Sequence, residues 1–364
     1  LGICSAFGVY LMMGNAHVAF SIVGSTAYDA IRSDLFAVIP LFVLMGALFF
    51  HTDLARRVFD ALDLLLGRLP GRLSFLAVGG GTVFAALTGS SLANAAMLGS
   101  LLIPEMEKRN YKRHKSIGPI MAVGGLVIII PPSAIAVLLA GIANVDVGRV
   151  LIAGIAPGLL LAFAFCVVVA IQLWLDPQAA PAYETRHVPI AQKMRLLLVD
   201  TVPIIIIIVS VVGSIIFGIA TPTESAAFGV VGVLLASMFF RTLSLKAIQA
   251  SLRDTVAVGG MVFFIVMGSA VFSQLLAYSG ASRGLVRWAT DFDLAPVLIL
   301  LTMVAILLVL GTFMDQVSMI LITVPIFFPL AAALGFDHTW FAIVVLLAIE
   351  IGLATPPFGL LLFV

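Results

Sequence analysis

Residues 88–94 read TGSSLAN, a run of hydroxyls, an amide and a glycine between two apolar segments, 73–87 and 92–104. Irregular backbone of this kind cannot lie bare in hydrocarbon, because each unpaired polar group there costs several kcal/mol. It is tolerated at membrane depth only around a polar cavity or inside protein. In a membrane protein, the stretch therefore predicts a broken helical hairpin with a polar tip.

The composition of the chain indicates a membrane protein. Hydrophobic residues make up 62% of the 364 residues and charged residues 10%, against roughly 45–50% and 25% in soluble domains. A net charge of +1 gives no basic surface for nucleic acid. Cys4 and Cys166 both lie in apolar runs, and the five histidines lack metal-ligand spacing, so neither a disulfide framework nor a metal centre is expected.

Apolar runs of two lengths follow one another along the chain. A transmembrane helix needs about 20 apolar residues, whereas runs of about 10 to 14 suggest partial crossings. The full-length candidates are 1–25, 35–52, 150–175, 196–219, 223–240, 256–279 and 294–312. The shorter runs are 73–87, 92–104, 116–130, 133–143, 316–330 and 339–354. Because the chain begins and ends inside apolar runs, we expect it to be a fragment.

Three segments differ from these runs. Residues 53–72 and 243–254 are amphipathic and predict helices lying at the membrane surface. Residues 176–195 form the one long polar linker, which separates the chain into two halves.

The two halves share an architecture. When the first half is aligned on the second with Ser90 against Asp315, three pairs of prolines fall into the same register. These pairs are Pro104 with Pro329, Pro131 with Pro356 and Pro132 with Pro357. Five of the 19 basic residues lie in 105–115, beside the first polar break, whereas no Lys or Arg follows Arg287. By the positive-inside rule the halves point in opposite directions, which predicts an inverted repeat with its interface near the bilayer midplane.

The apolar runs, the linker and the repeat together predict that the chain has four parts. The first is a scaffold helix at 1–34, and the second is a repeat at 35–175 with hairpin 73–104 and a broken helix at 131–132. A linker with scaffold helices follows at 176–255. The last part is a second repeat at 256–364 with hairpin 294–330 and a broken helix at 356–357.

The tip of the first hairpin offers sites for both signs of charge. Ser90 and Ser91 are good N-caps for a helix from about Leu92 to Ile103, and the start of that helix presents free N–H groups to a carboxylate. The preceding helix ends near Thr88. Its carbonyl oxygens, together with Ser, Thr and Asn oxygens, can replace the hydration shell of a sodium ion.

The paired prolines predict a second source of oxygen ligands. Each proline removes the hydrogen bond to the carbonyl four residues back. The pairs at 131–132 and 356–357 therefore free four carbonyls: Val127, Ile128, Gly352 and Leu353. Doubled prolines at matching places favour ion sites over simple kinks.

Acidic residues within spans are rare and usually functional. Asp315 either caps the helix that follows it or balances a cation. Glu350 lies in mid-span and is either a proton carrier or a paired structural acid. Glu224 follows Pro222 at a helix start, where an acid complements the helix dipole.

Five motifs together resemble one known family. They are GRLPGRLSFLAVGGGTVFAALTGSSLANAAMLGSLLIPEMEKRNY, IIIPPSAIAVLLAG, TPTESAA, GTFMDQVSMILITVPIFFPLAAALGFD and IEIGLATPPFGLLLFV. The chain resembles, over nearly its whole length, the large membrane subunit of tripartite ATP-independent periplasmic (TRAP) transporters, the DctM-like family. Part of the family's first helix and its segment after FGLLLFV are missing, and no fused small-subunit helices occur.

The resemblance implies a function and an assembly. It implies sodium-coupled uptake of an organic acid, such as a C4-dicarboxylate or a sugar acid, by an elevator movement in the bacterial inner membrane. No cofactor is implied beyond sodium as the coupling ion. The implied partners are a small four-helix membrane subunit (DctQ-like) and a periplasmic substrate-binding protein (DctP-like), within a lipid bilayer.

The resemblance and the stranded carbonyls together select the candidate site residues. The substrate-binding candidates are Ser90, Ser91, Asn94 and Asp315. The sodium-binding candidates are Thr88, Gly89, Ser91, Asn94, Val127, Ile128, Pro131, Gly311, Asp315, Gly352, Thr355 and Pro356.

Other functions stay open at this point. A proton-coupled transporter of the same architecture is the first alternative, and a passive channel is the second. An intramembrane enzyme using Ser90 or Asp315 is disfavoured, because no His or Lys lies near the serines and no second acid pairs with Asp315. A sensor or assembly subunit is a further alternative. ATP is excluded as the fuel because no G-x-x-x-x-G-K-[ST] motif occurs.

Overall fold

The computed structural model describes residues 2–32, 34–66, 69–89, 91–181, 194–195, 197–291, 294–356 and 359–363. These residues form helices joined by turns, and no strand occurs among them. Backbone contacts divide the chain into two units. Unit 1 comprises Leu1–Pro40, Ile135–Ala153 and Val256–Leu360. Unit 2 comprises Leu41–Ala134, Gly154–Thr255 and Leu361–Val364.

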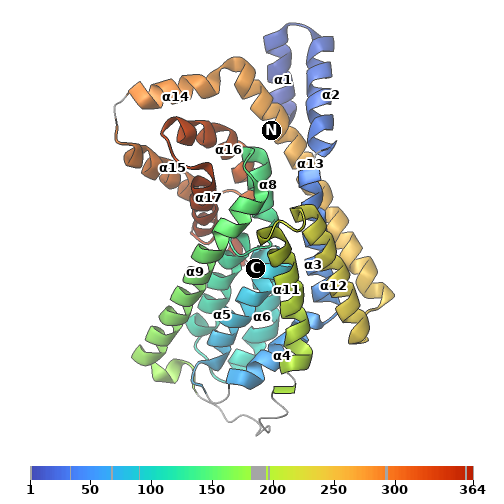
Figure 1. Ribbon diagram of the computed structural model, residues 1–364. Helices are drawn as coiled ribbons and strands as arrows, with labels where there is room; N and C mark the ends of the chain where they lie inside the picture. Colours follow the sequence, from blue (N-terminus) through green and yellow to red (C-terminus); the bar gives the residue numbers. More distant parts are fainter. Residues whose placement is uncertain are drawn as a thin grey trace. The chain divides into compact units, whose positions relative to one another are not determined.

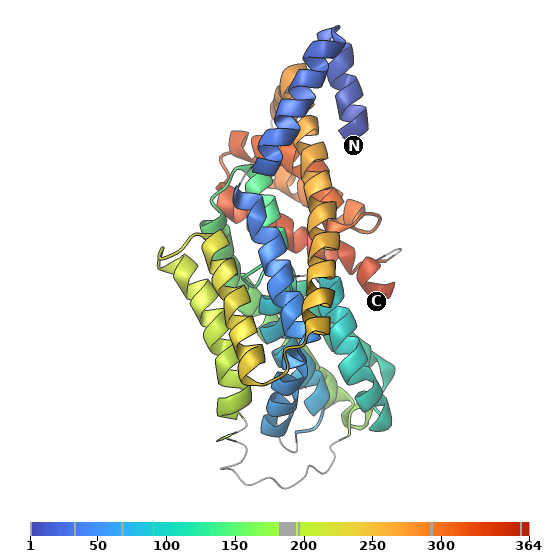
Figure 2. The same cartoon turned by 90° about the vertical axis from the view of Figure 1, so that its right-hand side faces the viewer.

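Unit 2 contains the first hairpin and the helices around it. Its elements are most of α3 (Asp34–His51), α4 (Leu54–Leu66), α5 (Arg72–Thr88), α6 (Ser91–Lys108), α7 (Arg113–Gly124), the 3-10 turn η1 (Gly125–Ile128), most of α9 (Val147–Leu175), the 3-10 turn η2 (Pro177–Ala179), the π-helical turn η3 (Leu197–Thr201), α11 (Val202–Ile216) and α12 (Pro222–Phe239). Helices α5, α6 and α7 pack against one another (Figure 1), and α11 packs along α12 (Figure 2). Phe84 of α5 stacks on Phe59 of α4 with ring centroids 4.5 Å apart, which joins the amphipathic helix to this core.

Unit 1 contains the second hairpin. Its elements are α1 (Gly2–Met13), α2 (Ala16–Arg32), most of α8 (Ala134–Ala143), the larger part of α13 (Leu245–Ser279), α14 (Ala281–Asp291), α15 (Pro296–Gly311), α16 (Gln316–Ala333) and α17 (His338–Leu353). A last 3-10 turn, η4 (Leu360–Phe363), ends the described chain. Helices α15, α16 and α17 all contact one another, and α14 packs on α16 (Figure 1).

The described chain has five helices long and apolar enough to cross a membrane: Val147–Leu175, Leu198–Ile216, Pro222–Phe239, Leu245–Ser279 and Gln316–Ala333. Four of them fall on predicted spans, at 150–175, 196–219, 223–240 and 256–279. The helix content and these spans confirm the predicted all-α, multi-pass membrane class. That the hairpins are re-entrant stays a prediction.

Four predicted elements are wrong. The run 316–330, predicted as a short one, belongs to α16, which is long enough to cross a membrane, whereas the run 294–312, predicted as full length, forms only the shorter α15. The run 1–25 is not one span, because α1 ends at Met13 and α2 begins at Ala16. Gly14 between them takes a left-handed φ of 62°, and the side chain of Asn15 accepts the N–H of His17 at 2.9 Å, which caps the new helix. The run 243–254 is not a separate surface helix, since it continues into the following span as the 35-residue α13.

Helix boundaries repeat in the register that the sequence predicts. Helix α6 begins at Ser91 and α16 begins at Gln316, which directly follow the aligned positions Ser90 and Asp315. The last residues of these two helices, Lys108 and Ala333, align in the same register. The starts of α7 and α17 align as well. The opposite orientation of the two repeats stays a prediction.

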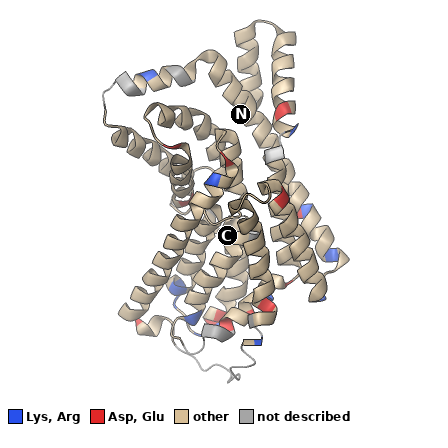
Figure 3. Cartoon of the chain, viewed as in Figure 1, with Lys and Arg blue, Asp and Glu red and all other residues tan. Residues whose placement is uncertain are grey.

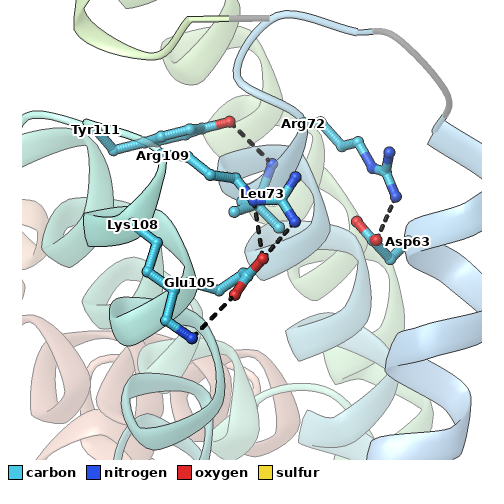
Figure 4. A network of polar contacts seen from close by, with 7 residues as sticks. All are labelled: Asp63, Arg72, Leu73, Glu105, Lys108, Arg109 and Tyr111. Carbon is cyan, nitrogen blue, oxygen red and sulfur yellow. Dashed lines mark hydrogen bonds and ion pairs between the residues drawn. The ribbon is translucent and has the colours of Figure 1, made fainter. Parts of the chain in front are cut away.

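Charged residues of unit 2 gather near the ends of its helices (Figure 3). Arg72 at the start of α5 pairs with Asp63 of α4, and Arg109 donates to Glu105 (Figure 4). Tyr111 accepts the N–H of Leu73 at 3.5 Å through its hydroxyl oxygen. The loop after α6 is thereby joined to the beginning of α5, so both open ends of the first hairpin are held together.

The beginning of the predicted linker belongs to this same network. The N–H of Lys112 donates to the carbonyl of Ala179 at 2.9 Å, and the N–H of Gly71 donates to that of Ala180 at 3.2 Å. Both alanines are fully buried. Lys112 also pairs with Asp176 through Nζ and Oδ2 at 2.5 Å. Residues 176–180 are therefore packed onto the hairpin, whereas 182–193 lie outside the described residues.

The Lys112–Asp176 pair predicts a pH-dependent contribution to stability. A hydrogen bond from the Lys112 ammonium, and then its charge, hold the pKa of Asp176 below the ordinary value. A lowered carboxyl pKa stabilises the folded state above the unfolded pKa, at about 3.9, and this contribution disappears as the pH falls through the folded pKa. We expect Asp176→Asn to lower the Tm in detergent slightly at neutral pH and to leave it unchanged in strong acid.

Glu107→Gln is the matched control, since Glu107 is an exposed carboxylate near the C-terminal end of α6, shortly before Lys112. Thermal unfolding of both variants across the acid range measures the effect. Equal pH profiles for the two variants would show that the pair contributes nothing.

Candidate functional site

The tip of the first hairpin breaks where the sequence predicts. Helix α5 ends at Thr88, and Gly89 follows with φ 61°, a left-handed conformation that glycine adopts without strain. Helix α6 begins at Ser91, so Ser91 is its first residue and is buried. Ser90 lies outside the described residues, and its role as an N-cap and substrate ligand stays a prediction.

Asn94 occupies the first turn of α6 and is fully buried. Its Nδ2 donates to the carbonyl of Val123 in α7 at 3.5 Å, which orients the amide. Its Oδ1 has no hydrogen-bond partner among the described residues. Burying an amide oxygen without a partner is unfavourable, because the oxygen gives up its hydrogen bonds to water. Native proteins therefore usually satisfy such an oxygen with a donor, a water molecule or an ion. Asn94 is thus placed to offer an oxygen ligand.

The broken helix of the same unit lies against this hairpin. The turn η1, which contains Val127 and Ile128, packs on both α5 and α6. The carbonyl of Leu126 accepts the N–H groups of both Ile129 (3.1 Å) and Ile130 (2.9 Å), and helical bonding ends after them because Pro131 and Pro132 have no N–H to donate. Unit 2 therefore packs η1, which ends at Ile128, against both helices of the first hairpin.

Ala134, two residues after the Pro131-Pro132 break, also approaches the tip. A methyl group added at Gly89 would lie 3.7 Å from Cβ of Ala134, the first residue of α8. Pro131 and Pro132 are themselves buried. Gly89 at the hairpin tip thus lies close to the start of α8, and the gathering of the predicted ligands of this half into one site stays a prediction.

In unit 1, Asp315 caps the second hairpin's outgoing helix. Its Oδ2 accepts the N–H groups of Val317 at 3.0 Å and of Ser318 at 3.1 Å, and its Oδ1 accepts the hydroxyl of Ser318 at 2.5 Å. The predicted cap is confirmed. The carboxylate uses the free N–H groups at the start of α16, and its further role toward a cation stays a prediction.

Gly311 and Gly352 meet where α15 crosses α17. A methyl group added at Gly311 would lie 2.7 Å from Cα of Gly352, and one added at Gly352 would lie 2.8 Å from Cα of Gly311. Real Cβ atoms do not approach backbone this closely, so only glycine permits the crossing. Both glycines are predicted sodium ligands, and that role stays a prediction, whereas the crossing shows a packing role for both.

One detail of the second broken helix differs from the prediction. The carbonyl of Gly352 is not free, because it accepts the N–H of Thr355 at 3.0 Å. After Leu353 the chain turns instead of continuing as a helix. This turn places the amide of Thr355 next to the carbonyl of Gly352, three residues earlier. The hydroxyl of Thr355 donates to the carbonyl of Ile351 at 2.5 Å. Pro356 follows, and Pro357 lies outside the described residues.

One contact at this site is not predicted from the sequence. Gln316, directly after Asp315, donates through Nε2 to Oε2 of Glu350 at 2.9 Å. Glu350 is buried in α17, with 6% of its surface exposed. The mid-span acid is visible in the sequence, but its proximity to a residue on another helix is not.

Glu224 has the structural role predicted for it. Its carboxylate accepts the N–H of Thr221 at 2.8 Å, and the hydroxyl of Thr221 accepts the N–H of Glu224 in return. This reciprocal pair is a capping box at the start of α12.

The sequence of the chain matches a family of known transporters. The family model described as the tripartite ATP-independent periplasmic transporter, DctM component, matches residues 1–364. The chain belongs to the DctM family. The predicted resemblance is therefore confirmed, and the chain is a TRAP transporter large permease by family.

Individual DctM relatives are similar over most of the chain. The C4-dicarboxylate TRAP transporter large permease protein DctM of Pseudomonas aeruginosa is 34% identical over 327 residues, which cover 90% of this chain and 75% of that protein. The sialic acid TRAP transporter large permease protein SiaM of Vibrio cholerae is 30% identical over 329 residues, with the same two coverages. These relatives are permeases and not enzymes.

A solved transporter structure shares the fold. The YdaH transporter of Alcanivorax borkumensis superposes with a TM-score of 0.62 over 90% of this chain and 76% of that chain, at 15% sequence identity. This similarity supports the membrane transporter fold of the DctM chain and carries no information on its substrate.

Proposed function

We propose that this DctM-family chain is the large membrane subunit of a sodium-coupled secondary transporter that imports an organic acid. The observation that carries the sodium proposal is the buried Asn94 Oδ1, which has no partner among the described residues and belongs to α6, a helix that packs on η1. The relatives named for C4-dicarboxylates and sialic acid support a carboxylate substrate.

The sodium site of unit 2 follows from the chemistry of its oxygens. In transporters with broken helices, unwound carbonyls and the C-terminal ends of half-helices coordinate sodium. The ends of α5 and η1 supply such carbonyls, and Asn94 adds a neutral side-chain oxygen. The predicted ligands Thr88, Gly89 and Val127 belong to these two ends.

The carboxylate of the substrate is better matched to α6 than to α16. Both helices begin at a hairpin tip, and helix starts attract anions. At α16, however, the Asp315 carboxylate already accepts two N–H groups and repels a second anion. We therefore propose that the substrate carboxylate binds at the start of α6, at Ser91. In this proposal Asp315 caps α16 at the tip of the second hairpin and binds a cation.

The assembly and movement follow the family. A separate four-helix DctQ-like subunit and a DctP-like periplasmic binding protein are the proposed partners in the bacterial inner membrane. An elevator movement of the hairpins and broken helices is the proposed transport step. A proton-coupled transporter of the same architecture is the alternative, and buried Glu350 is the feature that favours it.

Uptake into proteoliposomes tests the proposal. The chain is reconstituted with its small subunit and binding protein, and labelled succinate and N-acetylneuraminate are offered under an imposed sodium gradient, an imposed proton gradient or neither. We expect accumulation above the external concentration only with the sodium gradient. Equilibration without accumulation would indicate a channel, and accumulation driven by protons alone would indicate the alternative.

A further inference from the structure

We infer that Gln316 and Glu350 are a positioning pair, which holds the tip of the second hairpin in register with the end of α17. The inference rests on the proposed transport function, since it assigns these residues a task in forming that site. Neither residue is given contact with substrate or ion. Gln316 is the first residue of α16 and directly follows Asp315, so fixing Gln316 fixes the cap beside it.

The first support is the contact and its surroundings. Gln316 Nε2 donates to Glu350 Oε2 at 2.9 Å, and Glu350 is 6% exposed. An acid at this depth in a membrane helix is costly to bury unless polar groups compensate it. A bond from Gln316 does so while it ties α16 to α17. Loss of this bond therefore affects both the acid and the hairpin tip.

The second support is a contact on the other helix of the same hairpin. Gly311, the last residue of α15, touches Gly352 of α17 through its backbone. Glu350 and Gly352 are two positions apart, and a helix turns about 100° per residue, so they project from different faces of α17. The last turn of α17 therefore contacts α15 through Gly352 and α16 through Glu350. Both contacts lie immediately before the chain breaks at Thr355.

The third support is a difference between the two repeats. In the register that sets Ser90 against Asp315, the positions aligned with Gln316 and Glu350 are Ser91 and Gly125. Gly125 has no side chain, so the first repeat cannot form the same bond. The pair is thus a feature of the second hairpin alone and not a general element of the repeat.

Exchanging the two side chains tests the pair. Gln316→Glu alone places two carboxyl groups together, and we expect transport at subsaturating sodium to fall by about tenfold or more. Adding Glu350→Gln restores an amide-to-carboxylate bond with donor and acceptor reversed, and we expect the double variant to recover to within about twofold of the parent. Gln249→Glu, the same change at an exposed position of α13, is the control and should have no effect.

Two further measurements separate positioning from other roles. Glu350→Gln alone keeps a carbonyl acceptor for Gln316 but removes the carboxyl group. If Glu350 only positions the hairpin, the transport rate should keep its pH profile. If Glu350 carries protons, that pH profile should be lost. Gln316→Met removes the donor without adding charge, and we expect a raised half-saturation concentration for sodium. Failure of the exchange to restore transport, or a flattened pH profile in Glu350→Gln, would overturn the inference.

The exchange also has a readout independent of the coupling ion. Thermal unfolding in detergent should show the same loss in Gln316→Glu and the same recovery in the double variant. If the parent protein is driven by protons, the sodium proposal fails while this recovery still confirms the pair. If sodium drives the parent and no recovery occurs, the pair fails and the proposed function stands.

Discussion

Replacing Asn94 by alanine is expected to raise the sodium concentration for half-maximal uptake by about 10- to 100-fold. A hydrogen-bonding or ligating group opposite a charge contributes about 1.5–3 kcal/mol, and each 1.4 kcal/mol corresponds to about tenfold in affinity. The buried Oδ1 of Asn94, on the helix that packs on η1, is the oxygen that this variant removes. Initial rates of uptake into proteoliposomes, measured across sodium concentrations, give the half-saturation value.

Two companion variants make this result specific. Asn94→Asp keeps an oxygen ligand, so its sodium dependence should remain closer to that of the parent. Ser100→Ala removes a hydroxyl from the same helix, where it donates to the carbonyl of Met97 at 2.9 Å, and should leave the half-saturation unchanged. An unaltered sodium dependence in Asn94→Ala would exclude Asn94 as a ligand and remove the main support for the unit 2 site.

A second large effect is expected from Gly311→Ala. Its methyl group would lie 2.7 Å from Cα of Gly352, and backbone cannot rotate away as a flexible side chain can. Overpacking of this kind typically costs about 1–3 kcal/mol. We expect a clear fall in Tm in detergent and loss of most transport, because the end of α15 must move away from α17. Gly352→Ala should behave alike, since it meets Gly311 from the other side.

Gly260→Ala is the matched control within the same unit. Gly260 lies in α13 with no atom within 4 Å of an added methyl group. Alanine favours helix over glycine by roughly 0.5–1 kcal/mol, so this variant should be neutral or slightly more stable. Equal Tm values for Gly311→Ala and Gly260→Ala would show that the crossing is not tightly packed.

Local signals in the sequence predict where the helices of this protein begin and end. Gly89 within TGSSLAN ends α5, Asp315 caps α16, and Thr221 and Glu224 start α12, because each of these residues acts on backbone groups within a few positions of itself. The alignment of the two halves likewise predicts that α6 and α16 have matching bounds. The same local reasoning fails at Gly14, where a single glycine and the capping Asn15 divide an apolar run that is otherwise long enough for one span.

The contacts that complete each unit depend on residues far apart in the chain, and no local signal specifies them. Gly311 and Gly352 are both visible as glycines, yet only the crossing of α15 with α17 shows that their backbones touch. Glu350 and Gln316 are both polar residues in apolar surroundings, and their bond exists because two helices bring them within 2.9 Å. Sequence by itself therefore determined the membrane class, the family and the breaks, through composition, motifs and capping. Tertiary structure decided which side chains meet at each break, because packing and not local propensity sets those distances.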